Sequence, residues 1–338
     1  MERKIQTAFQ AYRGLTMRKL AGLIPFLMVL AACAPRYTIN HDYPKEPVSF
    51  PRDFAAHYDA QTEWWYYTGH IFDEDKNEYG FELTFFKRIT NDDRTPCLRL
   101  PAYWVKDVGM VGHFAITDVK ARKFRYAQKF NLFSKGTAAE DRYEVMIGNW
   151  SAVENNGIHQ LKAKMESYEI ELELKPFKEP VLNGPGGIVA KGGGNGNYYY
   201  SITRIEVNGT LKAGGTVKKV HGIAWMDHEY GTLKVARGQK GWDWFSLQLN
   251  EGTDIMLYMI RSRDEVLSES GGTVVFISGD YKWLKLSDFE VKTLATWHSK
   301  RTGADYPAAW EIFIKPLDMK LNVMPVMADQ ELTLPPID

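Results

Sequence analysis

The feature that most constrains the fold is a long succession of short segments that each have the pattern of a β-strand. Within each segment apolar and polar residues alternate, or β-branched and aromatic residues are concentrated, while long amphipathic helices are scarce. The segments are residues 63–71, 79–87, 112–118, 142–148, 159–163, 168–174, 198–207, 215–225, 242–249, 254–261, 273–277, 289–297 and 308–314. A period of two places successive side chains on opposite faces of a strand, so the pattern predicts an all-β protein.

Turn-forming residues separate these segments. The hairpin signals are Asp75-Lys76-Asn77, Asn156-Gly157, Asn208-Gly209 and Gly214-Gly215. Residues 118–133 fit either a helical turn or a strand, and both interpretations stay open. Because the strands fall into two sets, we predict two antiparallel β-barrels packed side by side, one over residues 51–232 and one over residues 233–338.

The N-terminus is typical of an export signal. The basic pair Arg18-Lys19 precedes an apolar run at residues 20–32, which is too short to cross a bilayer, and Cys33 follows it. The ending Leu30-Ala31-Ala32-Cys33 resembles a bacterial lipoprotein signal, so we expect residues 1–33 to carry the signal, with lipidation at Cys33. An ordinary signal peptide with an incidental cysteine is the alternative, and Met17 is a second candidate start.

The prolines of residues 34–50 suit an extended tether. Ala34 follows the cysteine, and this resembles lipoproteins that are sorted to the outer membrane and face the periplasm. We therefore expect a membrane partner through the lipid anchor. Cys97 would then have no disulfide partner.

Composition excludes some partners. Lys and Arg total 42, as do Asp and Glu, so no nucleic-acid surface is predicted. The glycine-rich segment 182–197 lacks the Lys-Ser or Lys-Thr pair and the following helix of a phosphate loop, which favours a flexible loop at a barrel mouth. The 10 Trp, 18 Tyr and 17 Phe favour strands and apolar pockets.

Residues 221–231 place several ionisable side chains on one strand. Alternation puts His221, Trp225, Asp227 and Glu229 on one face and His228 on the other. Two carboxyl groups on one apolar face raise the pKa of one of them, so Asp227 and Glu229 could be a general acid and its electrostatic partner.

The alternative is a pair of salt bridges. The candidate cations are Arg204, Arg237 and Arg261. No bound metal is expected, because His221 and His228 lie on opposite faces and the chain has no His-x-His or cysteine cluster. A Gly-x-Ser-x-Gly nucleophile motif is also absent from the sequence.

Three aromatic strands could line a pocket for a hydrophobic ligand, since Trp and Tyr combine apolar area with one polar atom. Plain core packing is the alternative. The candidate ligand-binding residues are Glu63, Trp65, Tyr67, Tyr199, Trp242 and Trp244.

Taken in order, these motifs resemble the lipocalin-like carotenoid 1,2-hydratase (hydroxyneurosporene synthase) family, with its AttH-like double lipocalins. The resemblance spans residues 48–336. The motifs that carry it are EWWYYTGH at 63–70, FELTFF at 81–86, YYYS at 198–201, AWMDHE at 224–229 and GWDWFSLQL at 241–249.

The resemblance implies two lipocalin-like barrels, a hydrophobic ligand and hydration of an alkene without a cofactor. Asp227 would protonate the alkene, and Trp225 with Trp65 or Tyr67 would stabilise the carbocation. His221, Glu229 or Tyr230 would position or deprotonate the water. A lipid carrier or envelope protein without catalysis is the competing hypothesis, and a secreted hydrolase is the third.

Overall fold

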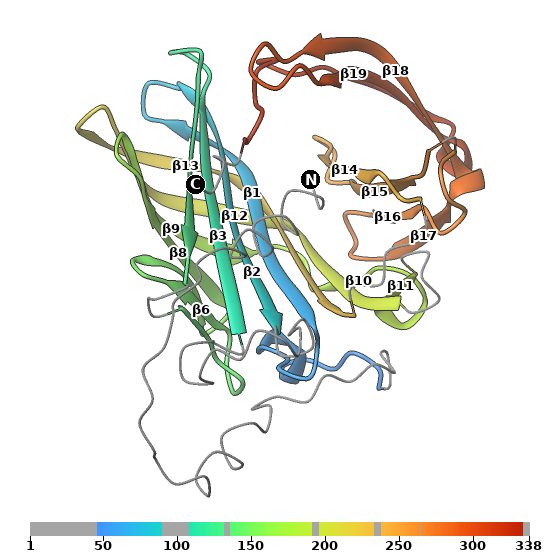
Figure 1. Ribbon diagram of the computed structural model, residues 1–338, viewed down its shortest axis with the longest axis horizontal. Helices are drawn as coiled ribbons and strands as arrows, with labels where there is room; N and C mark the ends of the chain where they lie inside the picture. The colour runs from blue at the N-terminus through green and yellow to red at the C-terminus, as the bar shows by residue number, and fades with distance from the viewer. Residues whose placement is uncertain are drawn as a thin grey trace, which may run out of the picture.

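The computed structural model describes residues 46–89, 108–131, 136–190, 196–232, 238–263 and 265–333, and the prediction of an all-β fold is confirmed in them (Figure 1). Only four short 3-10 helices accompany the strands in this part of the chain, and no helix there is long and apolar enough to cross a membrane. The predicted signal segment, Cys33, Cys97 and Arg237 lie outside the described residues.

The first region is built from strands β1 to β13 and two 3-10 helices. Its elements are η1 Arg52–Phe54, β1 Thr62–Asp73, β2 Glu78–Ile89, β3 Val108–Asp118, β4 Lys123–Phe130, β5 Gly136–Ala138, β6 Glu144–Ile147, β7 Trp150–Asn155, β8 Ile158–Lys164, β9 Tyr168–Pro176, β10 Val181–Leu182, η4 Pro185–Gly187, β11 Ile188–Ala190, β12 Gly196–Ala213 and β13 Thr216–Gly231.

These strands form one antiparallel sheet in the order β4-β3-β2-β1-β13-β12-β9-β8-β7-β6-β5, with β10 and β11 paired to β12. The sheet curls, because β6 packs against β2 and β3 from the other end of the strand order. Residues of alternating positions, such as Leu83 and Phe85 of β2 and Met226 of β13, fill the enclosed core. The face that lines this core is called the interior face below, and the opposite one the outer face.

The second region contains β14 to β20. Its elements are β14 Gly241–Gln248, β15 Asp254–Arg261, β16 Gly271–Val275, β17 Tyr281–Lys285, η5 Leu286–Asp288, β18 Phe289–His298, β19 Asp305–Ile314, η6 Lys315–Leu317 and β20 Met319–Val323. The strands divide into the sheets β14-β15-β16-β17 and β18-β19-β20, which share a small apolar core. Figure 1 shows this region in orange and red beside the larger sheet, and two β regions side by side agree with the predicted architecture.

Most of the predicted turns are found, and one is wrong. Lys76, Asn156 and Gly214 have positive φ in hairpin turns. Asn208-Gly209 does not turn, because β12 continues through it to Ala213. A Cβ atom on Gly209 would lie 2.2 Å from the carbonyl oxygen of Glu171 on β9, so this glycine permits close approach of two strands. Within residues 118–133, which the sequence left open, residues 119–122 form a turn and Lys123–Phe130 form β4, while 132–133 lie outside the described residues.

Buried polar contacts join the two regions. Asp254 of β15, which is fully buried, binds Lys178 Nζ at 2.7 Å and Arg204 Nη2 at 2.6 Å. Trp225 and Tyr199 of the outer face pack with Met256 of β15. The outer face of β12 and β13 around Tyr199 and Trp225 is therefore covered by the second region.

Candidate functional site

The alternation predicted for residues 221–231 is present in β13. Trp225 and Asp227 lie on the outer face with Tyr199 and Ser201 of β12. Met226 and His228 lie on the interior face, where His228 bonds Tyr200 and Glu63. Polar groups therefore occupy both faces of the same strands, in two separate clusters.

Asp227 is surrounded by neutral hydrogen-bond donors. Its Oδ1 atom accepts from Ser201 Oγ at 2.5 Å and from Trp225 Nε1 at 2.7 Å, and its Oδ2 atom accepts from Tyr199 OH at 2.8 Å. Trp244 Nε1 of the second region donates in turn to Tyr199 OH at 3.0 Å. We call Asp227, Ser201, Tyr199, Trp225 and Trp244 the outer cluster.

Burial dominates the ionisation of Asp227, which is 4% exposed. Desolvation, with a smaller contribution from Glu229, raises the pKa of Asp227 to about 7, although its three donors favour the charged form. The carboxyl group can therefore hold a proton near neutral pH and release it to a neighbouring atom.

The alternative of salt bridges to Asp227 is not found for the two arginines that the structure describes. Arg204 binds Asp254, and Arg261 Nε lies 3.1 Å from Asp243. Glu229 accepts a hydrogen bond from Asn197 Nδ2 at 2.9 Å. Without a cation beside it, Asp227 keeps its raised pKa.

Strand register extends the outer cluster into a row of polar residues across six strands. Each member is the Cα partner of the next: Ser201, Asp227, Tyr66, Thr84, His113 and Gln128. Directly paired residues have side chains close enough to touch. Tyr66 is half-buried and its ring meets Trp244 edge-on at 5.3 Å between centroids, so the row stays partly open at its centre.

A further carboxyl group on the outer face, besides Asp227 and Glu229, was not among the residues predicted from the sequence. Glu82 of β2 accepts a hydrogen bond from Thr84 Oγ1 at 2.8 Å, and desolvation raises its pKa. Desolvation also lowers the pKa of His113 to about 4, so its imidazole is neutral. The alternation of the FELTFF segment signals that Glu82 and Thr84 face away from the core, but nothing in it shows that they lie beside Tyr66.

The other cluster lies on the interior face and is charged. Glu63 is fully buried, and its carboxylate binds Lys87 Nζ at 2.8 Å, His57 Nδ1 at 2.8 Å and His228 Nε2 at 2.7 Å. Asp53 Oδ1 lies 3.3 Å from His57 Nε2. We call Glu63, Lys87, His57, His228 and Asp53 the interior cluster.

The charges of the interior cluster stabilise one another. Desolvation would raise the pKa of Glu63, but the charges of Lys87 and His57 hold it well below its usual range. Desolvation likewise opposes the charge of His57, yet Glu63 and Asp53 raise the pKa of His57 to about 9. Glu63 is thus a paired anion within the interior core, away from Asp227, and its role in ligand binding stays a prediction.

The atoms of His57, Glu63 and His228 also have the spacing of metal ligands, since they lie within 4.8 Å of one another. The ammonium group of Lys87 already occupies one carboxylate oxygen, and a protonated His57 has no lone pair for a metal. These three side chains are therefore better suited to sharing protons than to coordinating a metal ion. That the protein binds no metal stays a prediction.

Several predicted residues lie away from Asp227. Trp65 and Tyr67 belong to the interior core, on the opposite side of β1 from Trp225, so they cannot assist a cation beside it as predicted. Tyr230 stacks on His57 inside, with ring centroids 3.6 Å apart. These corrections follow from the register, which places Tyr66 opposite Asp227.

Two further predicted residues lie at the surface. His221 is exposed and lies six residues from Asp227 along β13. Its ring contacts Phe72 of β1. The side chain of Trp242 is 52% exposed. The structure therefore brings together Asp227, Trp225, Tyr199 and Trp244, with Glu229 next on the same face, and separates the other candidates from them.

Comparisons with known proteins agree with this architecture. A family model described as AttH-like matches residues 41–337. The crystal structure of an AttH protein from Nitrosomonas europaea is similar, at 26% identity and a TM-score of 0.77 over 87% of this chain and 89% of that one. Kievitone hydratase from Nectria haematococca has the same fold at 12% identity, with a TM-score of 0.67 over 88% of this chain and 85% of that one. No curated protein matches.

Proposed function

The chain belongs to the AttH-like family, and we propose that it binds a hydrophobic small molecule on the outer face and adds water to an alkene of that molecule. The observation that carries the proposal is the protonatable carboxyl group of Asp227, which is buried among neutral donors and aromatic rings. An acyclic carotenoid or another isoprenoid is the candidate substrate class, and the reaction needs no redox cofactor.

The proton of Asp227 begins the reaction. The alkene π electrons take this proton, which forms a C–H bond and leaves a carbocation on the neighbouring carbon. The Ser201, Trp225 and Tyr199 donors already point at the carboxylate that results, so they stabilise the charge that develops on it without reorganisation.

Aromatic rings and a water molecule complete the cycle. Tyr66, Trp225 and Trp244 place ring faces or edges around the outer cluster, and ring faces stabilise a nearby cation. Water then adds to the cation, and its proton returns to the Asp227 carboxylate. The net reaction is alkene plus water to alcohol, and Glu229, two residues along β13 on the same face, could orient the water.

Isotope incorporation from labelled water tests this proposal. An acyclic isoprenoid alkene incubated with the protein in ¹⁸O water should give a labelled alcohol, and Asp227→Asn should reduce the rate by about 100-fold or more, as expected for loss of a general acid. The control is Tyr230→Phe, since Tyr230 lies on the interior face. Unchanged turnover in Asp227→Asn would refute the assignment.

A non-catalytic lipid carrier is the second candidate, because Asp227 is only 4% exposed and a carrier does not require access to it. Mass spectrometry of small molecules that co-purify with the protein identifies the ligand in either case. A ligand that is bound equally by the wild type and by Asp227→Asn, and that neither of them converts, favours the carrier.

We also propose, from the sequence alone, that Cys33 is lipidated and anchors the protein in the outer membrane. The support is the Leu-Ala-Ala-Cys ending after a short apolar run. Intact-mass measurement and membrane fractionation test it: Cys33→Ser should lose the mass of the lipid and leave the membrane fraction. If Cys33→Ser keeps the lipid mass and stays in the membrane fraction, the anchor is contradicted.

A further inference from the structure

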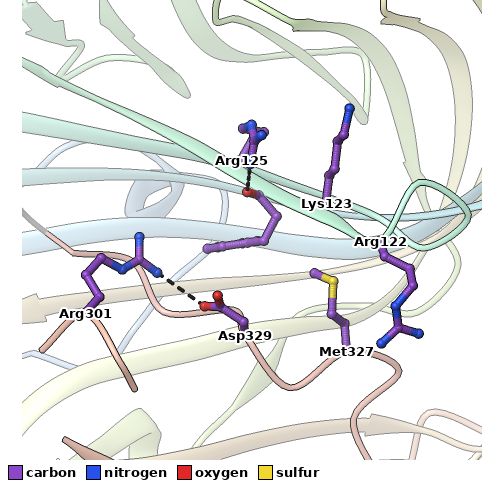
Figure 2. A pocket seen from close by; sticks show the side chains of 7 residues that line it. Arg122, Lys123, Arg125, Arg301, Met327 and Asp329 are labelled. Atoms are coloured by element: carbon purple, nitrogen blue, oxygen red, sulfur yellow. Dashed lines mark hydrogen bonds and ion pairs between the residues drawn. The ribbon is translucent and has the colours of Figure 1, made fainter. Parts of the chain in front are cut away.

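Two neighbouring hollows open where the first region meets the end of the β18–β19 hairpin and the C-terminal tail. Their volumes are about 210 Å³ and 300 Å³, and both are lined by Arg301 and Asp329. Neither includes a residue of the outer cluster, and the first is bordered by Phe124 of β4 and Met327 of the tail. The first hollow is shown in Figure 2.

The lining of these hollows is strongly basic. The turn before β4 and the strand itself supply Arg122, Lys123 and Arg125, and the hairpin supplies Lys300 and Arg301. Asp329 is the one acidic residue among the lining residues, and its Oδ1 atom lies 3.2 Å from Arg301 Nη2. Within the described residues, Arg122 and Lys123 are exposed and have no acidic partner, so an anion would find unpaired charge there.

The cations of β4 and of the turn before it lie along an open sheet edge. Strand β4 is the last strand of the large sheet, so the backbone groups on one side of it have no partner strand. Arg125 Nη1 donates to the carbonyl oxygen of Phe124 at 3.0 Å, which holds the guanidinium at this edge. In an antiparallel strand the N–H and C=O groups of one residue point the same way, so the Phe124 N–H also faces the edge.

The wall of the hollow opposite β4 is held in place by the contacts of Arg301. Arg301 donates to Tyr126 OH at 3.4 Å and to the Glu331 carbonyl oxygen at 3.2 Å, besides its bond to Asp329. Figure 2 shows Lys123 and Arg125 on one side of β4 and Arg122 on the other, so positive groups flank the edge from both sides. A ligand lying across the edge would contact charge from either side.

We propose that this basic hollow at the β4 edge binds a phosphate group. Phosphate monoesters and phosphodiesters both carry full negative charge and at least two non-bridging acceptor oxygens, which pair with guanidinium groups through charge-assisted hydrogen bonds. The backbone N–H of Phe124 adds a neutral donor of the kind that phosphate oxygens accept. The phosphate can belong to a soluble compound or to a lipid headgroup, and the two sources share this chemistry.

The test measures both sources with the full chain in the Cys33→Ser background, because the proposed lipid anchor would itself bring the protein to any vesicle. Calorimetric titration at low salt with inorganic phosphate probes the soluble source, and flotation with phosphatidylcholine vesicles, with and without phosphatidylglycerol, probes the headgroup. The test variant is Arg122→Gln/Arg125→Gln, and the charge-matched control is Lys282→Gln/Lys292→Gln, two exposed lysines of the second region. Thermal melts confirm that both variants fold.

We expect the wild type and the control to bind, and the test variant to bind at least about tenfold more weakly, because charge-assisted hydrogen bonds commonly contribute that factor. Binding of phosphate alone identifies a soluble ligand, and binding that requires phosphatidylglycerol identifies a headgroup. The proposal is overturned if the wild type binds neither phosphate nor vesicles, or if the control variant binds as weakly as the test variant. Hydration at Asp227 is measured separately, so each proposal can fail without the other.

Discussion

Two buried carboxyl groups on neighbouring strands of this sheet ionise in opposite ways. Glu63 on the interior face has a pKa well below its usual range, whereas Asp227 on the outer face has a pKa raised to about 7. Both are almost fully buried, so desolvation alone cannot explain the difference. Glu63 has cations beside it, and Asp227 has only neutral donors among its described contacts.

The difference separates a structural role from a chemical one. Pairing fixes the charge of Glu63 at every physiological pH, so it braces the barrel and cannot donate a proton. Because only neutral donors contact Asp227 within the described residues, its protonated and charged forms are both populated near neutral pH, and a general acid requires this. The kind of partner, more than the depth of burial, therefore distinguishes the two clusters.

The largest expected effect is on stability, at the interior cluster. Glu63→Gln leaves Lys87 without its anion and His57 with Asp53 alone, and we expect it to lower the free energy of unfolding by about 3–5 kcal/mol in urea titration. The double variant Glu63→Gln/Lys87→Met removes the orphaned ammonium and should recover part of the loss. If Glu63→Gln lowers the free energy of unfolding no more than Asp227→Asn does, the distinction between the two clusters is wrong.

At the outer cluster the expected effect depends on pH. The folded pKa of Asp227, about 7, lies above the unfolded value of 3.8, so wild-type stability falls as pH rises from about 4 to 7. Asp227→Asn lacks this loss, and its stability relative to the wild type should increase by up to about 4 kcal/mol over that window. Urea titrations at pH 4 and pH 7.5 measure it. A constant difference between the two proteins would contradict the raised pKa.

His57 gives the same sign in a higher pH window. Its folded pKa of about 9 lies above the unfolded value of 6.5, so its contribution is complete below pH 6.5 and is lost as pH rises through 9. Relative to His57→Gln, the wild type should lose up to about 3 kcal/mol between pH 6 and pH 9.5. Chemical denaturation at the two pH values checks this, with His70→Gln, an exposed histidine, as control.

The smallest effect compares two adjacent tyrosines. Tyr199→Phe removes one donor from Asp227 and should raise its pKa by about one unit, since such a bond contributes about 1 kcal/mol. Tyr200→Phe removes a partner of His228 on the other face and should leave that pKa unchanged. The pH dependence of hydration, or the infrared band of the protonated carboxyl group, reports the difference. Equal shifts in both variants would show that the faces are coupled.

The sequence predicted the strands and the two faces of β13 well, because alternation is a local property. It assigned Asp227 and Trp225 to one face and His228 to the other, as the structure shows. It failed at Trp65 and Tyr67, since the face of β1 that meets Trp225 depends on how two distant strands pair. Register is set by the whole sheet and cannot be read from either strand alone.

The charged partners of Glu63 were missed for a related reason. Lys87 comes from the next strand and His57 from the segment before β1, and in the sequence each resembles an ordinary polar residue. The Asn208-Gly209 pair was misread because a dipeptide typical of hairpins also serves where two strands approach closely. In both cases the deciding contact comes from outside the strand that carries the residue.

The placement of the two clusters back to back on β13 limits how this protein can evolve. A single inserted residue between Gly222 and Trp225 would shift the alternation by one, turning Asp227 and Glu229 toward the core and His228 toward the second region. The catalytic candidate would then lose its donors at the same moment as Glu63 lost an imidazole. A single-residue insertion or deletion between these positions would therefore disrupt both clusters at once unless a β-bulge absorbed it.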